Sequence, residues 1–394
     1  MFYPRKLLPS LKEHLAQKQI TVITGMRRTG KTTLLKQLLS EIPSVNKIYI
    51  DLERVDNREL FSEKNYEAVI YALKQRGLSF DERAYIALDE IQLAKNLPSV
   101  LKYLYDNYSI KFIATGSSSF YIKNLFSESL AGRKKIFELY PLDFGELLAF
   151  KQIPFQAIFS WENPPFLNKA EYERIKVYYE EYIKFGGFPE VALATPAAQK
   201  KDLLADILSS YINIDIKTLA DFRGQKDIYS LIKMLAGRIG NRLDYAKLSR
   251  LAGLARQTVQ NYIEFFEKTY LISRLPVLTK NPDREIIKAQ KLYFCDNGLA
   301  NLLSDISGGA QFENAVFCQL RHFGELRYYA LKSGREIDFI LEKKIALETK
   351  ESPTKIDQKE LTDLSQLAGL EKTYLIGRQA TPDFNDFLWG GEIR

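Results

Sequence analysis

The stretch ITVITGMRRTGKTTLLKQLL, residues 20–39, decides the fold of the first part of the chain. Five β-branched residues predict a buried strand at 20–24, two glycines bound the loop that follows, and the leucine-rich end predicts a helix. A strand, a glycine-bounded loop and a helix in this order present backbone N–H groups to an anion at the helix N-terminus. The stretch therefore predicts a phosphate-binding loop within an α/β sheet.

This loop satisfies the pattern G-x-x-x-x-G-K-[ST] between Gly25 and Thr32. We expect Lys31 to reach the β- and γ-phosphate oxygens of a nucleotide, and the hydroxyl of Thr32 to bind Mg²⁺. The other residues expected to bind nucleotide lie in the same stretch and are Arg27, Arg28, Thr29, Gly30 and Thr33. For the two arginines, contact with phosphate and packing against a partner are both open. The predicted ligands are ATP and Mg²⁺.

A second element, YIALDE at residues 85–90, is an apolar strand that ends in two carboxylates. Asp89 is placed to hold the Mg²⁺ shell, and Glu90 to orient or deprotonate an attacking water. An Asp-Glu pair alone is more often a solvated turn. Together with the phosphate loop, it predicts ATP hydrolysis.

Further strands are expected at 47–51, 111–115 and 135–139, separated by helical stretches, which is the pattern of a parallel sheet. At this point the chain resembles the AAA+ ATPases, and more narrowly a prokaryotic group of AAA-type ATPases with an uncharacterised C-terminal domain. The segments that carry the likeness are GMRRTGKTTLL, YIALDEIQ, FIATGSSS, LAGRKKIFELYPLDFGEL and YIKFGGFPEV.

The resemblance implies two further catalytic residues. A polar sensor of the γ-phosphate falls on Thr115 or Ser117, although both suit helix capping equally well. Arg133, just before the fifth strand, matches the arginine finger that such proteins supply to a neighbouring subunit, and the alternative is a surface ion pair. A finger at Arg133 implies a homo-oligomer.

The charge of +7 is concentrated between residues 233 and 291, where 12 Lys/Arg face 5 Asp/Glu. Within this segment, residues 243–263 read as a helix, a turn at Gly253 and a second helix, with Leu248, Leu251, Leu254, Val259 and Ile263 as the packed face. Two strands follow around a Lys280–Arg284 turn, which predicts a winged helix. The residues expected to contact DNA are Arg256, Gln257, Thr258, Gln260, Asn261, Lys280 and Arg284. The alternatives are a protein-binding module and a solvated basic surface.

In the last part, Asp338 is followed by Glu348-x-Lys350 at a spacing that resembles the core of PD-(D/E)xK nucleases. That resemblance implies that both acids bind Mg²⁺ and that Lys350 positions water or steadies the phosphate. Glu313, on a predicted helix, could complete the metal set. The alternatives are a solvated hairpin and a fold of this type that binds without cleaving.

The expected organisation is an ATPase core at 1–150, a linker and helical lid at 151–235, a winged helix at 236–300 and a nuclease-like α/β domain at 301–394. Two cysteines and two histidines exclude a disulfide framework and a Cys/His zinc site. Without a long apolar run or a signal peptide, the protein is expected in the cytoplasm. The predicted function is an ATP-hydrolysing AAA+ protein that acts on DNA. The alternative is a nucleotide-gated signalling or scaffold protein whose C-terminal domains bind protein partners.

Overall fold

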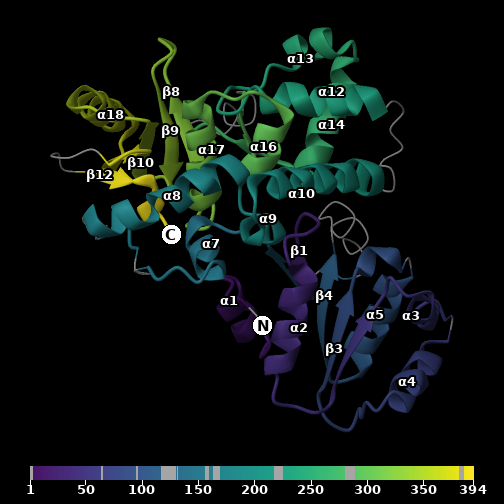
Figure 1. Cartoon of the computed structure of the whole chain (residues 1–394). Coiled ribbons are helices and arrows are strands. Elements are labelled where there is room, and N and C mark those ends of the chain that lie inside the picture. The colour runs from purple at the N-terminus through teal and green to yellow at the C-terminus, as the bar shows by residue number, and fades with distance from the viewer. Residues whose placement is uncertain are drawn as a thin grey trace. The chain divides into compact units, whose positions relative to one another are not determined.

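A computed structural model describes residues 3–63, 65–94, 96–116, 130, 132–155, 159–162, 169–216, 225–279, 289–380 and 386–394. These residues form two compact units (Figure 1). Unit 1 comprises residues 1–140 and 268–270, and unit 2 comprises residues 141–267 and 271–394. Ser117, Lys280 and Arg284, which carry predicted roles, lie outside the described residues.

Unit 1 is built on a parallel five-stranded sheet with the strand order β2-β3-β4-β1-β5. The strands are β1 (Ile20–Thr24), β2 (Lys47–Asp51), β3 (Ala84–Asp89), β4 (Ile110–Gly116) and β5 (Lys134–Glu138). Each overlaps a strand expected from the sequence. The helices are α1 (Leu8–His14), α2 (Lys31–Glu41), α3 (Val55–Leu60), α4 (Tyr66–Gln75), η1 (Ile91–Leu93) and α5 (Leu97–Asn107).

The central strands β1, β3 and β4 are buried on both faces, which explains why they read as largely apolar runs. On one face α1 and α2 pack through Leu11, Leu35 and Leu38 against Ile23 and Ile113. On the other face α4 and α5 supply a second apolar cluster (Figure 1). Because the parallel strands all end at one edge, the residues that follow β1, β3 and β4 meet there.

The first part of unit 2 is helical and then contains a two-stranded sheet. Its helices are α7 (Phe144–Phe150), α8 (Lys169–Phe185), α9 (Pro189–Leu193), α10 (Ala197–Ser210), the π-helix η2 (Tyr211–Ile216), α12 (Gln225–Ala236), α13 (Tyr245–Ala252), α14 (Arg256–Lys268) and α16 (Asn297–Leu303). The antiparallel pair consists of β6 (Ile272–Leu275) and β7 (Lys291–Phe294).

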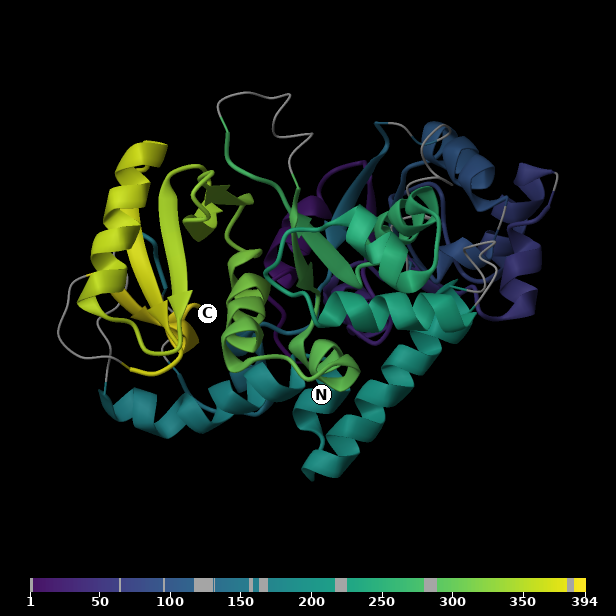
Figure 2. The same ribbon diagram turned by 90° about the horizontal axis from the view of Figure 1, so that it is seen from above.

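The last part of unit 2 is a mixed sheet with the strand order β12-β11-β10-β9-β8. Its elements are α17 (Gly308–Leu320), β8 (Leu326–Ala330), β9 (Glu336–Leu341), β10 (Ile345–Lys350), α18 (Lys355–Ala368), β11 (Lys372–Gly377), β12 (Phe387–Trp389) and η3 (Gly390–Glu392). β8, β9 and β10 are antiparallel neighbours, and α18 crosses over to β11, which runs parallel to β10. Figure 2 shows this sheet between α18 and α17.

Candidate nucleotide site and a second, charged cluster

The phosphate loop occupies the turn between β1 and α2, as predicted. Gly30 is the residue before α2 and has φ 94°, a left-handed backbone that favours glycine. A Cβ on Gly25 would lie 2.1 Å from the carbonyl oxygen of Leu139, so the loop approaches the end of β5 too closely for a side chain. Both glycines are therefore required by backbone geometry.

Lys31 lies in the first turn of α2 and folds back over the loop. Its Nζ donates hydrogen bonds to the carbonyl oxygens of Gly25 at 3.1 Å and Met26 at 2.9 Å, while Thr29 Oγ1 donates to Met26 at 2.9 Å. Lys31 is buried, being only 5% exposed. The ammonium is thereby held above the loop whose N–H groups would cradle a phosphate.

Arg5 also braces this loop, which the sequence reading missed. Its guanidinium donates to the carbonyl oxygen of Thr29 at 2.8 Å and to that of Tyr140 at 2.7 Å. The side chain is buried. It links the start of the chain, the phosphate loop and the segment after β5, and an arginine 24 residues before Thr29 gives no sequence signal of this role.

Asp89 ends β3 at the same edge of the sheet and is only 3% exposed. One carboxylate oxygen accepts a hydrogen bond from Tyr49 Oη at 2.7 Å, and the other accepts from Thr115 Oγ1. Within the described residues no lysine or arginine forms an ion pair with this carboxylate. A buried carboxylate held only by two hydroxyls fits a divalent cation, which would supply the missing positive charge.

Glu90 follows with a left-handed backbone, φ 57° and ψ 49°. Its N–H donates to Thr115 Oγ1 at 3.2 Å, and its carboxylate accepts from the Gln92 side chain. Thr115 lies on β4, whose residues pair with both β1 and β3, so its hydroxyl sits between the phosphate loop and the acidic pair. The structure thus brings together the loop, Asp89, Glu90 and Thr115.

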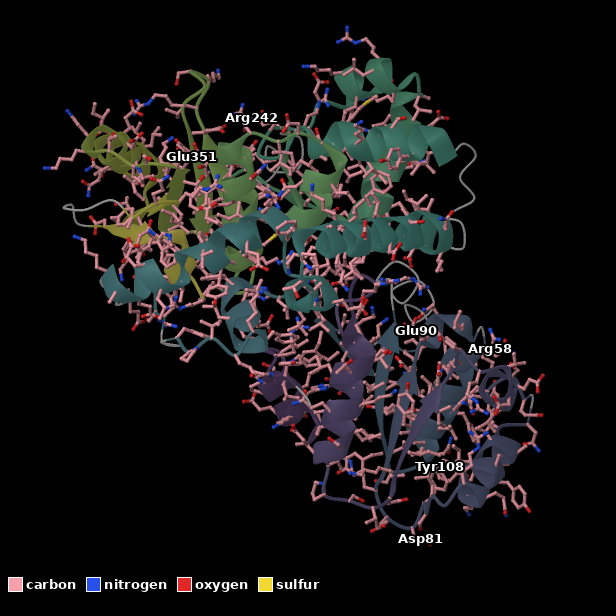
Figure 3. All side chains as sticks on the ribbon, in the orientation of Figure 1. Arg58, Asp81, Glu90, Tyr108, Arg242 and Glu351 are labelled. Carbon is pink, nitrogen blue, oxygen red and sulfur yellow. The ribbon has the colours of Figure 1, made fainter. Side chains whose placement is uncertain are left out.

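Arg133 lies at the opposite edge of the sheet. Its carbonyl oxygen accepts from the N–H of Ile20 at the start of β1, and its guanidinium pairs with Asp106 at 3.0 and 3.1 Å. Figure 3 shows the two edges, with Glu90 labelled at one and Tyr108 at the other. Arg133 is therefore remote from the phosphate loop of its own chain, and any contact it makes with a nucleotide must be with that of another molecule.

The helix pair of the basic segment forms as predicted. Asp244 caps α13 by accepting from the N–H of Lys247 at 2.9 Å, and Gly253 ends it with φ 66°. On α14, Val259 and Ile263 are buried, whereas Arg256, Gln257 and Asn261 are exposed and Thr258 and Gln260 are half-buried. One expectation was wrong: Leu251 is 53% exposed and does not pack between the helices.

Unit 2 contains a charged cluster around Lys291. From the sequence, this residue was predicted only to contribute to the basic excess of residues 233–291. Lys291 is 1% exposed on β7. Its Nζ lies 2.9 Å from Glu336, 3.1 Å from Asp338 and 3.5 Å from Glu313. Burial alone would disfavour the ammonium, but the three carboxylates outweigh that effect and raise the pKa of Lys291.

The predicted pair Asp338 and Glu348 is also assembled here, across the β9–β10 hairpin. Asp338 Oδ2 accepts from the N–H and hydroxyl of Thr349 at 3.0 and 2.8 Å, and Glu348 Oε2 accepts from the N–H of Asp338 at 3.2 Å. Lys350 Nζ lies 2.9 Å from Glu348 Oε1. Glu313 accepts from the Tyr293 hydroxyl at 2.6 Å.

Burial and the neighbouring charge of Asp338 raise the pKa of Glu313 to about 7 and that of Glu348 to about 8. Every oxygen of Asp338 and Glu348 already has a protein donor. Over the described ranges, no three His, Cys, Asp or Glu side chains are placed to hold one metal ion. The predicted nuclease residues therefore meet, but as arranged they do not fit a metal centre, because the ammonium of Lys291 lies among them.

Comparisons with known proteins agree with this architecture. Residues 17–148 match an AAA domain, and residues 176–309 match a domain of unknown function, DUF8612. An uncharacterized protein of Haemophilus influenzae is 26% identical over 82% of this chain and 80% of its own length. The ORC2 protein of Aeropyrum pernix in its ADP form aligns over 77% of this chain and 92% of that chain, with 12% identity and a TM-score of 0.39, too low to bear on function.

No helix within the described ranges combines the length and the apolarity needed to cross a bilayer.

The uncharacterized protein MJ1544 of Methanocaldococcus jannaschii is 32% identical over 83% of this chain and 73% of its own length. An AAA domain carries the phosphate loop, Asp89, Glu90 and Thr115. The chain thus belongs to the same family as MJ1544 and has an AAA domain in its first half.

Proposed function

We propose that unit 1 binds ATP with Mg²⁺ and hydrolyses it. The observation that carries this proposal is the buried Asp89 carboxylate, held by two hydroxyls without a cationic partner among the described residues, at the sheet edge that bears the phosphate loop. Thr32 and Asp89 would hold Mg²⁺, which would supply positive charge beside the β- and γ-phosphates. Lys31 would leave its two carbonyl partners to bind the same oxygens.

Glu90 is the residue we assign to the attacking water. Its left-handed backbone turns the chain away from β3, and Gln92 restrains its carboxylate. A carboxylate held in this way can orient a water and accept its proton. Thr115, hydrogen-bonded to both Asp89 and Glu90, is placed to sense the γ-phosphate and to couple its presence to the acidic pair.

The test of this proposal separates binding from turnover. Glu90→Gln should bind ATP like the wild type and lose hydrolysis by roughly 10²- to 10⁴-fold, because it keeps the shape but removes the base. Lys31→Ala should lose binding. Glu82→Gln, an exposed change of the same kind in unit 1, is the matched control. Unchanged hydrolysis by Glu90→Gln would refute the assignment.

Unit 2 is proposed to act on DNA. The exposed polar residues of α14, the basic excess of residues 233–291 and the β6–β7 pair together support a winged helix. Lys280 and Arg284, which the sequence predicts to contact DNA, lie outside the described residues. We propose that the C-terminal sheet has the nuclease-like fold expected from the sequence and that, because its acids are already paired, it contacts DNA without cleaving it.

DNA binding is tested with a labelled duplex across a range of salt concentrations. The paired change Arg256→Ala and Gln257→Ala should weaken binding and flatten its salt dependence, because phosphate contacts release counterions. DNA should also change the rate of ATP hydrolysis. If neither binding nor a rate change appears, the signalling or scaffold function becomes the better reading. Cleavage of the duplex by the wild type, lost in Asp338→Ala, would instead support the nuclease hypothesis.

A further inference from the structure

A pocket of about 640 Å³ opens in unit 2 beside the charged cluster. It is formed by the connection between α12 and α13, the first turns of α13 and the first residue of β9. Its charged and polar lining consists of Arg238, Asn241, Arg242, Asp244, Lys247 and Glu336. No role was predicted from the sequence for any of these six residues.

The pocket carries positive charge, and the two acids in its lining, Asp244 and Glu336, already have hydrogen-bond or ion-pair partners. Lys247 is exposed, and its ammonium makes no ion pair with any described residue. Asp244 is occupied as the cap of α13. Glu336 is shared between two cations, Arg242 at 2.8 Å and Lys291 at 2.9 Å, so one carboxylate faces two positive charges (Arg242 is labelled in Figure 3).

Arg238 adds a third cation. Its Nη1 donates to the carbonyl oxygen of Met234 at 2.6 Å, which fixes the side chain from α12. An arginine held by one nitrogen keeps the other donors of its planar fork for a ligand. The lining therefore combines a pre-oriented guanidinium with an exposed ammonium, and both groups bind phosphate.

The wall of the pocket is continuous with the cluster around Lys291. Gly240 lines the pocket with φ 74°, and a Cβ there would lie 2.6 Å from Glu313 Oε2. Glu336 belongs to both the pocket and the cluster. Because the ammonium of Lys291 offsets part of the negative charge behind this wall, a polyanion in the pocket meets less repulsion than three unpaired carboxylates would cause.

We propose that this pocket binds the backbone phosphates of a single nucleic-acid strand. The inference rests on the proposed action on DNA and adds the class of ligand and its place. The volume is that of a small-molecule pocket, which leaves room for a single strand but not for a duplex, whose major groove alone is about 12 Å wide. The pocket is lined by α13, and α14 of the same helix pair carries the residues proposed to contact duplex DNA, so both sites belong to unit 2.

The experiment measures the anisotropy of a fluorescein-labelled oligothymidylate bound to the full chain at several salt concentrations. Lys247→Ala should weaken binding several-fold at low salt and reduce the slope of log K against log salt by about 0.7, the value for one phosphate contact on a single strand. Lys247→Glu should weaken it further. Because the Lys247 ammonium forms no ion pair with any residue that the structure describes, both variants should show the thermal unfolding of the wild type.

Arg250→Ala is the matched control, since it removes one positive charge from the exposed face of the same helix but outside the pocket lining. An equal loss in Arg250→Ala would show diffuse attraction to the surface and overturn the pocket. Polyglutamate that competes as well as oligothymidylate would show a site for acidic peptides, and dTMP that competes as well would show a mononucleotide site. Either result overturns the proposal.

Failure of this inference can be told apart from failure of the proposed function. If the Lys247 variants bind oligothymidylate like the wild type while Arg256→Ala weakens duplex binding, only the pocket assignment falls. If the wild type binds neither probe, both the proposed action on DNA and the pocket assignment are refuted.

Discussion

The hydroxyl of Thr115 on β4 donates a hydrogen bond to the carboxylate of Asp89 at the end of β3. The same hydroxyl accepts from the N–H of Glu90. One threonine thereby holds the side chain of Asp89 and the backbone of Glu90. On its other edge β4 pairs with β1, which leads into the phosphate loop. A shift of β4 should therefore change the positions of both acids.

Thr115→Val removes this hydroxyl while keeping the volume. Because a hydrogen bond to a charged group contributes about 1.5–3 kcal/mol, we expect unfolding by denaturant to require less free energy by an amount in that range. ATP hydrolysis should fall at least tenfold. Thr115→Ser, which keeps the hydroxyl, should restore most of both. Equal activity in Thr115→Val and the wild type would contradict the role.

Arg133 is expected to act on the nucleotide of a second copy. Arg133→Ala should keep ATP binding and lose hydrolysis, because the guanidinium stabilises charge that grows on the γ-phosphate. Its pair with Asp106 is partly exposed and contributes only about 0–1 kcal/mol, so the fold should survive.

Mixing tests this arrangement directly. Arg133→Ala supplies an intact phosphate loop and Lys31→Ala supplies an intact Arg133, so a mixture of the two inactive variants should regain part of the ATPase rate. A mixture as inactive as its components, at concentrations where the chain is shown to self-associate, would rule out the finger.

Lys291→Met should destabilise unit 2. Removing one partner of a buried ion pair leaves uncompensated charge and typically costs about 3–5 kcal/mol. Thermal or urea unfolding measures the loss. Lys359→Met, at an exposed position of α18, is the control and should change stability by less than about 0.5 kcal/mol. A Lys291→Met variant as stable as this control would show that the cluster does not depend on the ammonium.

The stability of unit 2 should fall as the pH rises. Glu313 and Glu348 have pKa values raised to about 7 and about 8, against an ordinary value of 4.5, so the folded state holds protons that the unfolded state has released. The stabilisation is complete below pH 4.5 and is lost as the pH passes through about 7 to 8.

Thermal unfolding at pH 5.5 and at pH 8.5 measures this effect. Glu348→Gln, which stays neutral at both values, should narrow the difference between the two melting temperatures. Glu342→Gln, an exposed change at the end of the same hairpin, should not. The same difference in Glu348→Gln and the wild type would show that the carboxyl is not protonated in the folded protein.

The arrangement of the candidate nucleotide site was largely predictable because its parts follow the chain locally. Gly25 to Thr32 lie in one loop, and the acids directly end an apolar strand. Parallel strands all end at one edge, so local sequence already implies that these parts converge. Arg5 and Tyr49 were missed because they act through hydrogen bonds from distant positions that no local pattern marks.

In unit 2 the pattern predicted the elements better than their packing. The helix–turn–helix and the β9–β10 hairpin form where expected, since a capping Asp244, a left-handed Gly253 and alternating apolar residues are local signals. Leu251 was assigned to the packed face from its spacing alone, but which helical face is buried depends on what lies against it.

Sequence by itself determined the α/β class of unit 1 and the phosphate loop with its acidic strand end, because backbone geometry and short-range spacing specify them. Only the tertiary structure decided that Lys291 stands among the predicted nuclease acids and that a basic pocket adjoins them. Two of its partners, Glu313 and Asp338, lie 22 and 47 residues further along the chain. Which buried charges pair with one another depends on their distances in the folded chain. Neither composition nor hydrophobic periodicity specifies those distances.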